Sequence, residues 1–193
     1  MGAYCATQLS LFETTAPQGL VFQPDFLTDV EEQRLLEHVE RLEFREIVLR
    51  GQPARRTARH FGLDYDYDQR VQLDEAEQMP EWLLELRNRC GVLAGFAPEM
   101  LVEALVQRYP EGAPIGWHRD APPFGLVVGV SLASSARLRF RRPSAGHWTT
   151  WELDLPPRSA YVLDGEARSK WQHSIPPTKA LRYSITFRTL KQR

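Results

Sequence analysis

The sequence predicts a mainly β protein of the α+β class, in which two N-terminal helices pack on a closed β-sandwich of the jelly-roll type. The first observation is that helical periodicity is confined to the first half of the chain. The second is that everything after Met100 consists of short alternating or apolar runs separated by turn residues, which is typical of β-strands. At 193 residues, the chain suits one domain with a substantial core.

In the N-terminal part, residues 1–18 are predicted to form a flexible tail and residues 19–27 a short strand with a turn. Thr28 or Asp29 then caps a helix, because such side chains accept hydrogen bonds from the first-turn backbone. The apolar face of this helix recurs at helical spacing, at Leu35, Leu36, Val39 and Leu42.

A second helix is predicted to begin at Pro80 and to end near Gly91 or Gly95. About eight short strands follow it. The run at 126–132 is continuously apolar, as expected of a buried strand, whereas the arginines of 137–141 alternate and therefore face water on one side. The predicted strands comprise residues 101–109, 115–120, 126–132, 137–141, 148–155, 159–163, 173–175 and 183–190.

The composition limits the classes of function. A formal net charge of −1 lacks the overall positive charge of a non-specific nucleic-acid binder, so any such contact requires local basic patches. No apolar run approaches the ~20 residues of a membrane span, and no signal peptide is evident. Cys5 and Cys90 fit neither a disulfide nor a metal spacing, which favours a reducing compartment. We expect a cytoplasmic protein without membrane contact that acts as a monomer.

The segment 44–71 is rich in arginine and aromatic residues, and its glycines and proline exclude a helix. Arginines that meet phosphates, interleaved with aromatic rings that stack on bases, are typical of single-strand nucleic-acid binding. The alternative is a solvated basic loop beside half-buried tyrosines at a sheet edge. The interleaved residues are Arg50, Arg55, Arg56, Arg59, His60, Phe61, Tyr65, Tyr67 and Arg70.

A candidate metal site begins with His118 and Asp120, which share one face if residues 115–120 form a strand. One imidazole and one carboxylate are two thirds of the 2-His-1-carboxylate triad that holds non-haem Fe(II). His147 and His173 are candidates for the third ligand. His147 lies beside a turn and is expected to be exposed, whereas a jelly roll brings the late strand of His173 next to the early one. Alternatively, His173 is a structural histidine.

The last predicted strand places Arg182, Ser184, Thr186 and Arg188 on one face by its period of two. Two arginines on an inward-looking face are costly unless an anion meets them. A dicarboxylate co-substrate would do so, because a guanidinium forms a bidentate pair with a carboxylate. Alternatively, both arginines face bulk water at a sheet edge.

Together, these motifs resemble the AlkB family of Fe(II)/2-oxoglutarate-dependent dioxygenases, most clearly in the Arg-Tyr-x-x-Thr-Phe-Arg signature of residues 182–188. The resemblance extends over residues 20–190. It implies a double-stranded β-helix at 101–190 within a single catalytic domain at 19–193, with 44–71 as a nucleotide-recognition lid. It also implies Fe(II), 2-oxoglutarate and O2 as cofactors, with the metal on His118, Asp120 and His173.

The resemblance also implies roles for the residues around the metal. Arg182 would pair with the distal carboxylate of 2-oxoglutarate, and Arg188 would lie near its other end. Tyr109 would donate a hydrogen bond to the co-substrate. Gln107 and Ser184 stand where the family commonly has asparagine, and both retain the ability to hydrogen-bond.

The implied activity is oxidative dealkylation of N-alkylated bases in DNA or RNA, with the base single-stranded or flipped into the site. Pro122 stands where repair members of the family place an acidic residue that reads the base. A hydroxylase or demethylase of a protein or small molecule therefore stays open as the alternative. The intact triad argues against a third hypothesis, a non-catalytic binding module. The candidate substrate-binding residues are Arg55, Arg56, Arg59, His60, Tyr65 and Arg119.

Overall fold

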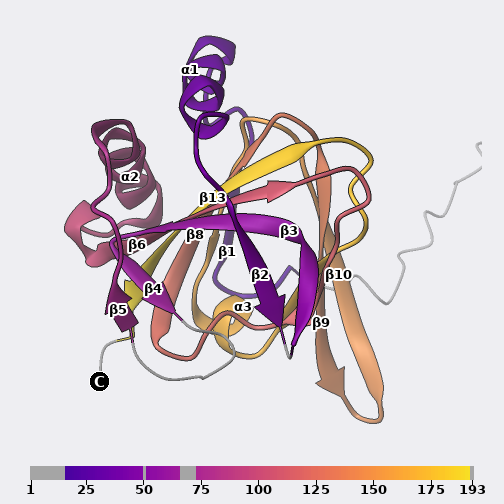
Figure 1. Ribbon diagram of the computed structural model, residues 1–193. Helices are drawn as coiled ribbons and strands as arrows, with labels where there is room; N and C mark the ends of the chain where they lie inside the picture. The colour runs from indigo at the N-terminus through magenta and orange to yellow at the C-terminus, as the bar shows by residue number, and fades with distance from the viewer. Residues whose placement is uncertain (1–15, 50, 66–72, 192–193) are drawn as a thin grey trace, which may run out of the picture.

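Two antiparallel β-sheets face each other and enclose the centre of the molecule (Figure 1). The computed structural model describes residues 16–49, 51–65 and 73–191. The large sheet has seven strands in the order β1-β11-β8-β13-β6-β3-β2. These strands are Leu20–Gln23 (β1), Ala160–Leu163 (β11), Phe124–Leu132 (β8), Arg182–Leu190 (β13), Leu101–Tyr109 (β6), Gln52–Phe61 (β3) and Arg45–Leu49 (β2).

The small sheet has four strands in the order β10-β9-β12-β7, so β7 and β10 are its edges. A separate two-stranded sheet pairs β4 with β5. The strands of the small sheet are His147–Leu155 (β10), Ala136–Ser144 (β9), Gln172–Ile175 (β12) and Ile115–His118 (β7). Those of the separate sheet are Leu63–Tyr65 (β4) and Leu73–Glu75 (β5).

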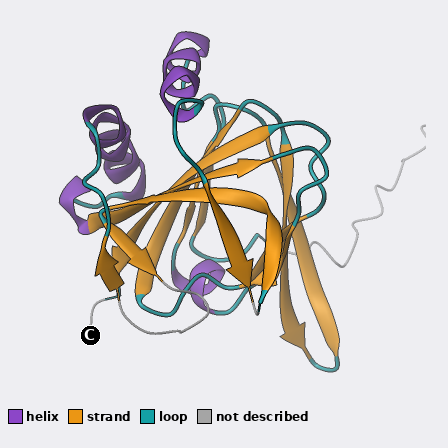
Figure 2. Cartoon of the chain, viewed as in Figure 1, coloured by secondary structure: helices purple, strands orange, loops and turns teal. Residues whose placement is uncertain are grey.

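Helices α1 (Asp29–Val39) and α2 (Glu81–Ala94) lie together on one side of the strands, as Figure 2 shows. Thr28 caps α1 in a reciprocal capping box with Glu31, and Gly95 closes α2 in the left-handed conformation, with φ of 70°. A 3-10 turn, η1 (Pro98–Met100), leads into β6, and the short helix α3 (Gly165–Ser169) precedes β12. No helix in these described segments is long and apolar enough to span a membrane.

The central strand β13 has a different environment on each face. Tyr183, Ile185 and Phe187 pack into the core beneath α1 and α2, together with residues of β6 and β8. The alternate side chains point into the space between the two sheets. A second apolar cluster, which includes Leu138, Phe140 and Trp171, packs between the two sheets. One strand therefore supports the helix-covered core and, on its other face, lines a polar interior.

The predicted α+β jelly-roll class, both helices and the strands after Met100 are confirmed. One local prediction is wrong, because the strand expected at 115–120 ends at His118. His147 is exposed, as expected, and begins β10 directly after the turn at 145–146. The flexible tail was expected at 1–18, of which 1–15 lie outside the described residues.

The arginine-rich segment is not a loop where the structure describes it. Its residues 45–49 and 52–61 form β2 and β3, and β3 pairs with β6 to extend the large sheet. The hypothesis of a solvated basic loop is therefore wrong for this part. Arg50, Tyr67 and Arg70 lie outside the described residues, as does the side chain of Tyr65.

Candidate metal centre

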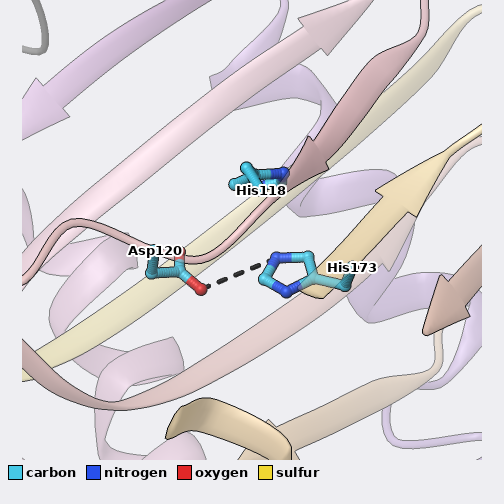
Figure 3. Close-up of side chains that lie close together, drawn as sticks. All are labelled: His118, Asp120 and His173. Carbon is cyan, nitrogen blue, oxygen red and sulfur yellow. Dashed lines mark ion pairs between the residues drawn. The ribbon is translucent and has the colours of Figure 1, made fainter. Parts of the chain in front are cut away.

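Three potential metal ligands meet at one end of the small sheet. His118 is the last residue of β7, Asp120 follows two residues later, and His173 lies on β12. His118 and His173 are direct cross-strand partners, so both imidazoles point to the same face. One ligand atom from each of the three residues lies within 4.8 Å of the other two. Figure 3 shows the three side chains converging.

Contacts among these groups leave ligand atoms available. The two imidazole centroids are 4.3 Å apart, and His173 Nε2 lies 3.6 Å from Asp120 Oδ2. His118 Nδ1 lies 2.9 Å from the carbonyl oxygen of Gly116. When Nδ1 is protonated and donates a hydrogen bond to this carbonyl, Nε2 remains as the ligand atom. Asp120 Oδ2 is buried and has no hydrogen-bond partner among the described residues.

The electrostatic environment keeps all three groups in the protonation state that a metal requires. Burial, together with neighbouring His118, lowers the pKa of His173 to about 3. Burial also lowers the pKa of His118, against the opposing charge of Asp120. Burial alone would raise the pKa of Asp120, but Arg188 and the two histidines hold it well below its ordinary value. Two neutral imidazoles and one carboxylate fit Fe(II) with open coordination positions.

A cavity of about 660 Å³ between the sheets contains this triad and a buried arginine. Arg182 is fully buried, and its Nε donates to Ser131 Oγ at 3.2 Å. Its Nη1 and Nη2 atoms have no hydrogen-bond partner among the described residues. Because an uncompensated buried guanidinium is costly, Arg182 suits a bidentate pair with a carboxylate. Tyr109 donates to Gln107 Oε1 at 2.7 Å, and both line the cavity with Ser184.

Arg188 has a different environment, because two carboxylates of this chain already meet it. Its Nη1 donates to Glu103 Oε1 and Oε2 at 3.1 and 3.2 Å, and its Nη2 lies 3.2 Å from Asp120 Oδ1. The sequence analysis missed Glu103. Its position in the sequence indicates a role in the site, because by strand alternation its carboxylate lies on the same face as Gln107 and Tyr109. The rest of this strand has the pattern of a buried one.

The five candidate substrate-binding residues whose side chains the structure describes divide into two groups. Arg56, Arg59 and His60 line the cavity from β3. Arg56 is buried, Arg59 pairs with Glu77, and His60 Nδ1 lies 3.4 Å from Glu103 Oε1.

Arg55 and Arg119 do not line this cavity. Arg55 is exposed and donates to the carbonyl of Glu111 at 3.3 Å, and Arg119 donates to the carbonyl of Lys170 at 3.0 Å. Their predicted contact with the substrate therefore stays a prediction, and any such contact would lie outside this cavity.

Residues 19–188 match the family described as the 2OG-Fe(II) oxygenase superfamily. The chain belongs to this superfamily. Fe(II), 2-oxoglutarate and O2 are therefore its cofactors, and His118, Asp120 and His173 form a possible iron site in this oxygenase.

Curated relatives of this oxygenase confirm the resemblance to AlkB proteins. The "Alkylated DNA repair protein ALKBH8 homolog" of Arabidopsis thaliana is 30% identical over 187 residues, which cover 83% of this chain and 51% of that protein. The "Probable RNA/DNA demethylase ALKBH6" of Danio rerio is 32% identical over 130 residues, which cover 66% of this chain and 52% of that protein. The chain thus spans about half the length of either relative.

The solved structure of OsALKBH1 has the same fold, with a TM-score of 0.69 at 14% identity over 91% of this chain and 98% of that one.

Proposed function

We propose that this oxygenase removes N-alkyl groups from bases in DNA or RNA. The observation that carries the proposal is the meeting, in one cavity, of a 2-His-1-carboxylate triad and the buried Nη atoms of Arg182. The first arrangement suits Fe(II), and the second suits the distal carboxylate of 2-oxoglutarate. The names of the ALKBH8 and ALKBH6 relatives support nucleic acid as the substrate.

The residues of the cavity have distinct proposed roles. His118, Asp120 and His173 hold Fe(II). Arg182 binds the distal carboxylate of 2-oxoglutarate, and Arg188 fixes the orientation of Asp120 by its contact at 3.2 Å. Hydrogen bonds from the cavity wall position the remainder of the co-substrate. These bonds come from Tyr109, Gln107 and Ser184.

The loaded site supplies an oxidation in which 2-oxoglutarate and O2 yield succinate and CO2, and one oxygen atom is inserted into a C–H bond of the N-alkyl group. The hydroxylated carbon then leaves as an aldehyde, which restores the N–H of the base. The protein binds both reactants side by side, and the apolar cluster between the sheets limits the access of water.

On the substrate side, Arg56 and Arg59 approach the cavity from β3 and are suited to the phosphates that flank the target base. A base inside a duplex cannot reach the triad, so the substrate is single-stranded or presents a flipped nucleotide.

We also propose a single catalytic domain over 19–193 with its jelly-roll core at 101–190, acting as a cytoplasmic monomer. The free, buried thiol of Cys90 agrees with a reducing compartment.

The test is anaerobic reconstitution with Fe(II) and 2-oxoglutarate, followed by O2 and a panel of methylated oligonucleotides in DNA and RNA. Formaldehyde released together with succinate supports the proposal and identifies the preferred polymer. Succinate without demethylation of any oligonucleotide contradicts the nucleic-acid substrate and favours a protein or small molecule.

Two histidine variants distinguish the metal site from a general effect of removing an imidazole. His173→Ala should abolish succinate formation while the fold is retained. His147→Ala removes an exposed imidazole at the start of β10 and should leave turnover unchanged. Retained turnover in His173→Ala would remove this residue from the proposed metal site.

A further inference from the structure

The outer face of the small sheet carries a stack of arginine and tryptophan side chains. Arg141 lies between two indoles, with its guanidinium carbon 4.4 Å from the ring centroid of Trp117 and 4.3 Å from that of Trp148. Arg139 extends the stack, because its guanidinium carbon lies 5.2 Å from the ring centroid of Trp117. We name these four residues the Trp–Arg ladder. It spans β7, β9 and β10, on the sheet face opposite the inward-pointing imidazoles of His118 and His173.

The ladder is positively charged, with Trp148 exposed and the other three residues half-buried. Trp148 is 49% exposed, which is high for an indole. The acidic residues of the same face, Glu152 and Asp154, both pair with Arg137, at 3.3 and 2.9 Å. Their charges are therefore offset locally, and those of Arg139 and Arg141 face outward without a carboxylate partner in any ion pair of the described residues. The two indoles and two guanidinium groups together form an extended platform of alternating planes.

The ladder continues into the catalytic centre. A second cavity, of about 1280 Å³, is lined by His118 and Asp120 as well as by Trp117 and Arg119. Further cations line the same cavity, namely Arg56, Arg168 and Lys191. Trp117 connects the two, because it lines this cavity and its ring also lies against Arg139 and Arg141. In Figure 1 the β9–β10 hairpin extends away from the rest of the molecule, which leaves its outer face open.

We propose that the Trp–Arg ladder binds the single-stranded stretch of nucleic acid that flanks the alkylated nucleotide. Bases would stack on Trp148 and Trp117, and the guanidinium groups of Arg139, Arg141 and Arg119 would meet phosphates. This combination recognises a strand without reading its sequence, because every base has a face that stacks on an indole. The inference rests on the proposed nucleic-acid substrate and adds a second contact area beyond the cavity.

The experiment measures binding of a labelled, unmodified single strand of twelve nucleotides to the Fe(II)-free protein at two salt concentrations. Trp148→Ala should weaken binding roughly tenfold, since stacking on one aromatic ring contributes ~1–3 kcal/mol per base. Arg141→Ala should also weaken binding and reduce the salt dependence by about one counterion. Arg34→Ala, which removes an exposed arginine on α1, is the matched control and should bind as the wild type does.

A second variant covers the case in which removal of a ladder residue disturbs the hairpin. Thr150 is exposed on β10 directly opposite Arg141, so Thr150→Glu adds a negative charge and leaves the stack intact. It should weaken binding of the single strand, with an unchanged melting temperature. Binding equal to wild type in both Trp148→Ala and Thr150→Glu would overturn the inference, as would equal losses of affinity for a duplex.

Turnover separates failure of this inference from failure of the proposed function. With an alkylated nucleoside, which has no flanking nucleotides to stack on the ladder, the ladder variants should turn over as the wild type does. With an alkylated twelve-nucleotide strand, they should show a higher KM at similar kcat. Wild-type dealkylation with no effect of the ladder variants on either substrate contradicts only the inference. Wild-type protein that neither binds nor dealkylates any strand contradicts the proposed function as well.

Discussion

The carboxylate of Glu103 offers a direct test of how this fold keeps charges in its interior. Glu103 lies on β6 opposite Arg188 of β13, and both are buried. Arg188 in turn contacts Asp120, so Arg188 links Glu103 to the proposed iron site. Glu103→Gln keeps the shape of the side chain and removes its charge.

The expected loss of stability follows from these contacts. Removing one partner of a buried ion pair typically costs about 3–5 kcal/mol, because the other charge remains buried. Here the cost falls at the lower end, about 3 kcal/mol, because Asp120 still lies 3.2 Å from Arg188 and the amide of glutamine retains one acceptor. For a domain of this size, the melting temperature should fall by roughly 6–12 °C.

Urea unfolding and thermal melting of the metal-free protein measure this loss. Glu99→Gln is the matched control, because Glu99 is exposed on η1, and its stability should match the wild type. Binding of Co(II), measured by calorimetry in place of Fe(II), should also weaken in Glu103→Gln, since Arg188 then holds Asp120 less firmly. A change below about 1 kcal/mol in unfolding free energy would refute the reasoning, because losses that small are typical of exposed pairs.

Three further predictions concern other parts of the chain. Arg182→Met should raise the 2-oxoglutarate concentration for half-maximal succinate formation at least roughly 30-fold, since truncating a buried charge pair costs ~2 kcal/mol or more; an unchanged requirement would remove Arg182 from the co-substrate site. Gly129→Ala should destabilise the protein by about 1–3 kcal/mol in urea unfolding, because the added methyl group meets the ring of Tyr161, and wild-type stability would contradict this. The hydrogen bond from the backbone N–H of Thr28 lowers the pKa of Glu31 below its ordinary value of 4.5, so its contribution to stability is present above that pH and lost as the pH falls. The stability difference between wild type and Glu31→Gln should therefore shrink below about pH 4.5, and a constant difference would exclude this linkage.

The candidate site was predictable where the signal is local in sequence. The alternation from Arg182 to Arg188 fixes which side chains of β13 share a face, and β13 is regular enough for this rule to hold. Asp120 was selected correctly as a potential ligand, but the assumed strand ends at His118. The loop after β7 brings the carboxylate of Asp120 toward His173. The alternation of side chains along a strand does not predict the path of such a loop.

Strand β3 was missed for a physical reason. Its even-numbered residues Arg56, Ala58 and His60 face a polar cavity, so the strand has no apolar face, and the alternating pattern that identifies strands is absent. The partner of Glu103 could not be predicted, because Arg188 is 85 residues away and only the pairing of β6 with β13 brings the two together.

The burial of so many charges beside the proposed iron site depends on the opposite face of the same strand. Arg182 and Arg188 carry desolvation costs of several kcal/mol each, which their partners only partly offset. Between them, Ile185 and Phe187 are fully buried beneath α1 and α2 and make the apolar contacts that keep β13 in place. The helices do not line the cavity, yet they stabilise the strand that holds both arginines in register with β6 and β8. Stability and co-substrate binding are thus divided between the two faces of one strand, which explains why its polar residues alternate so strictly with its apolar ones.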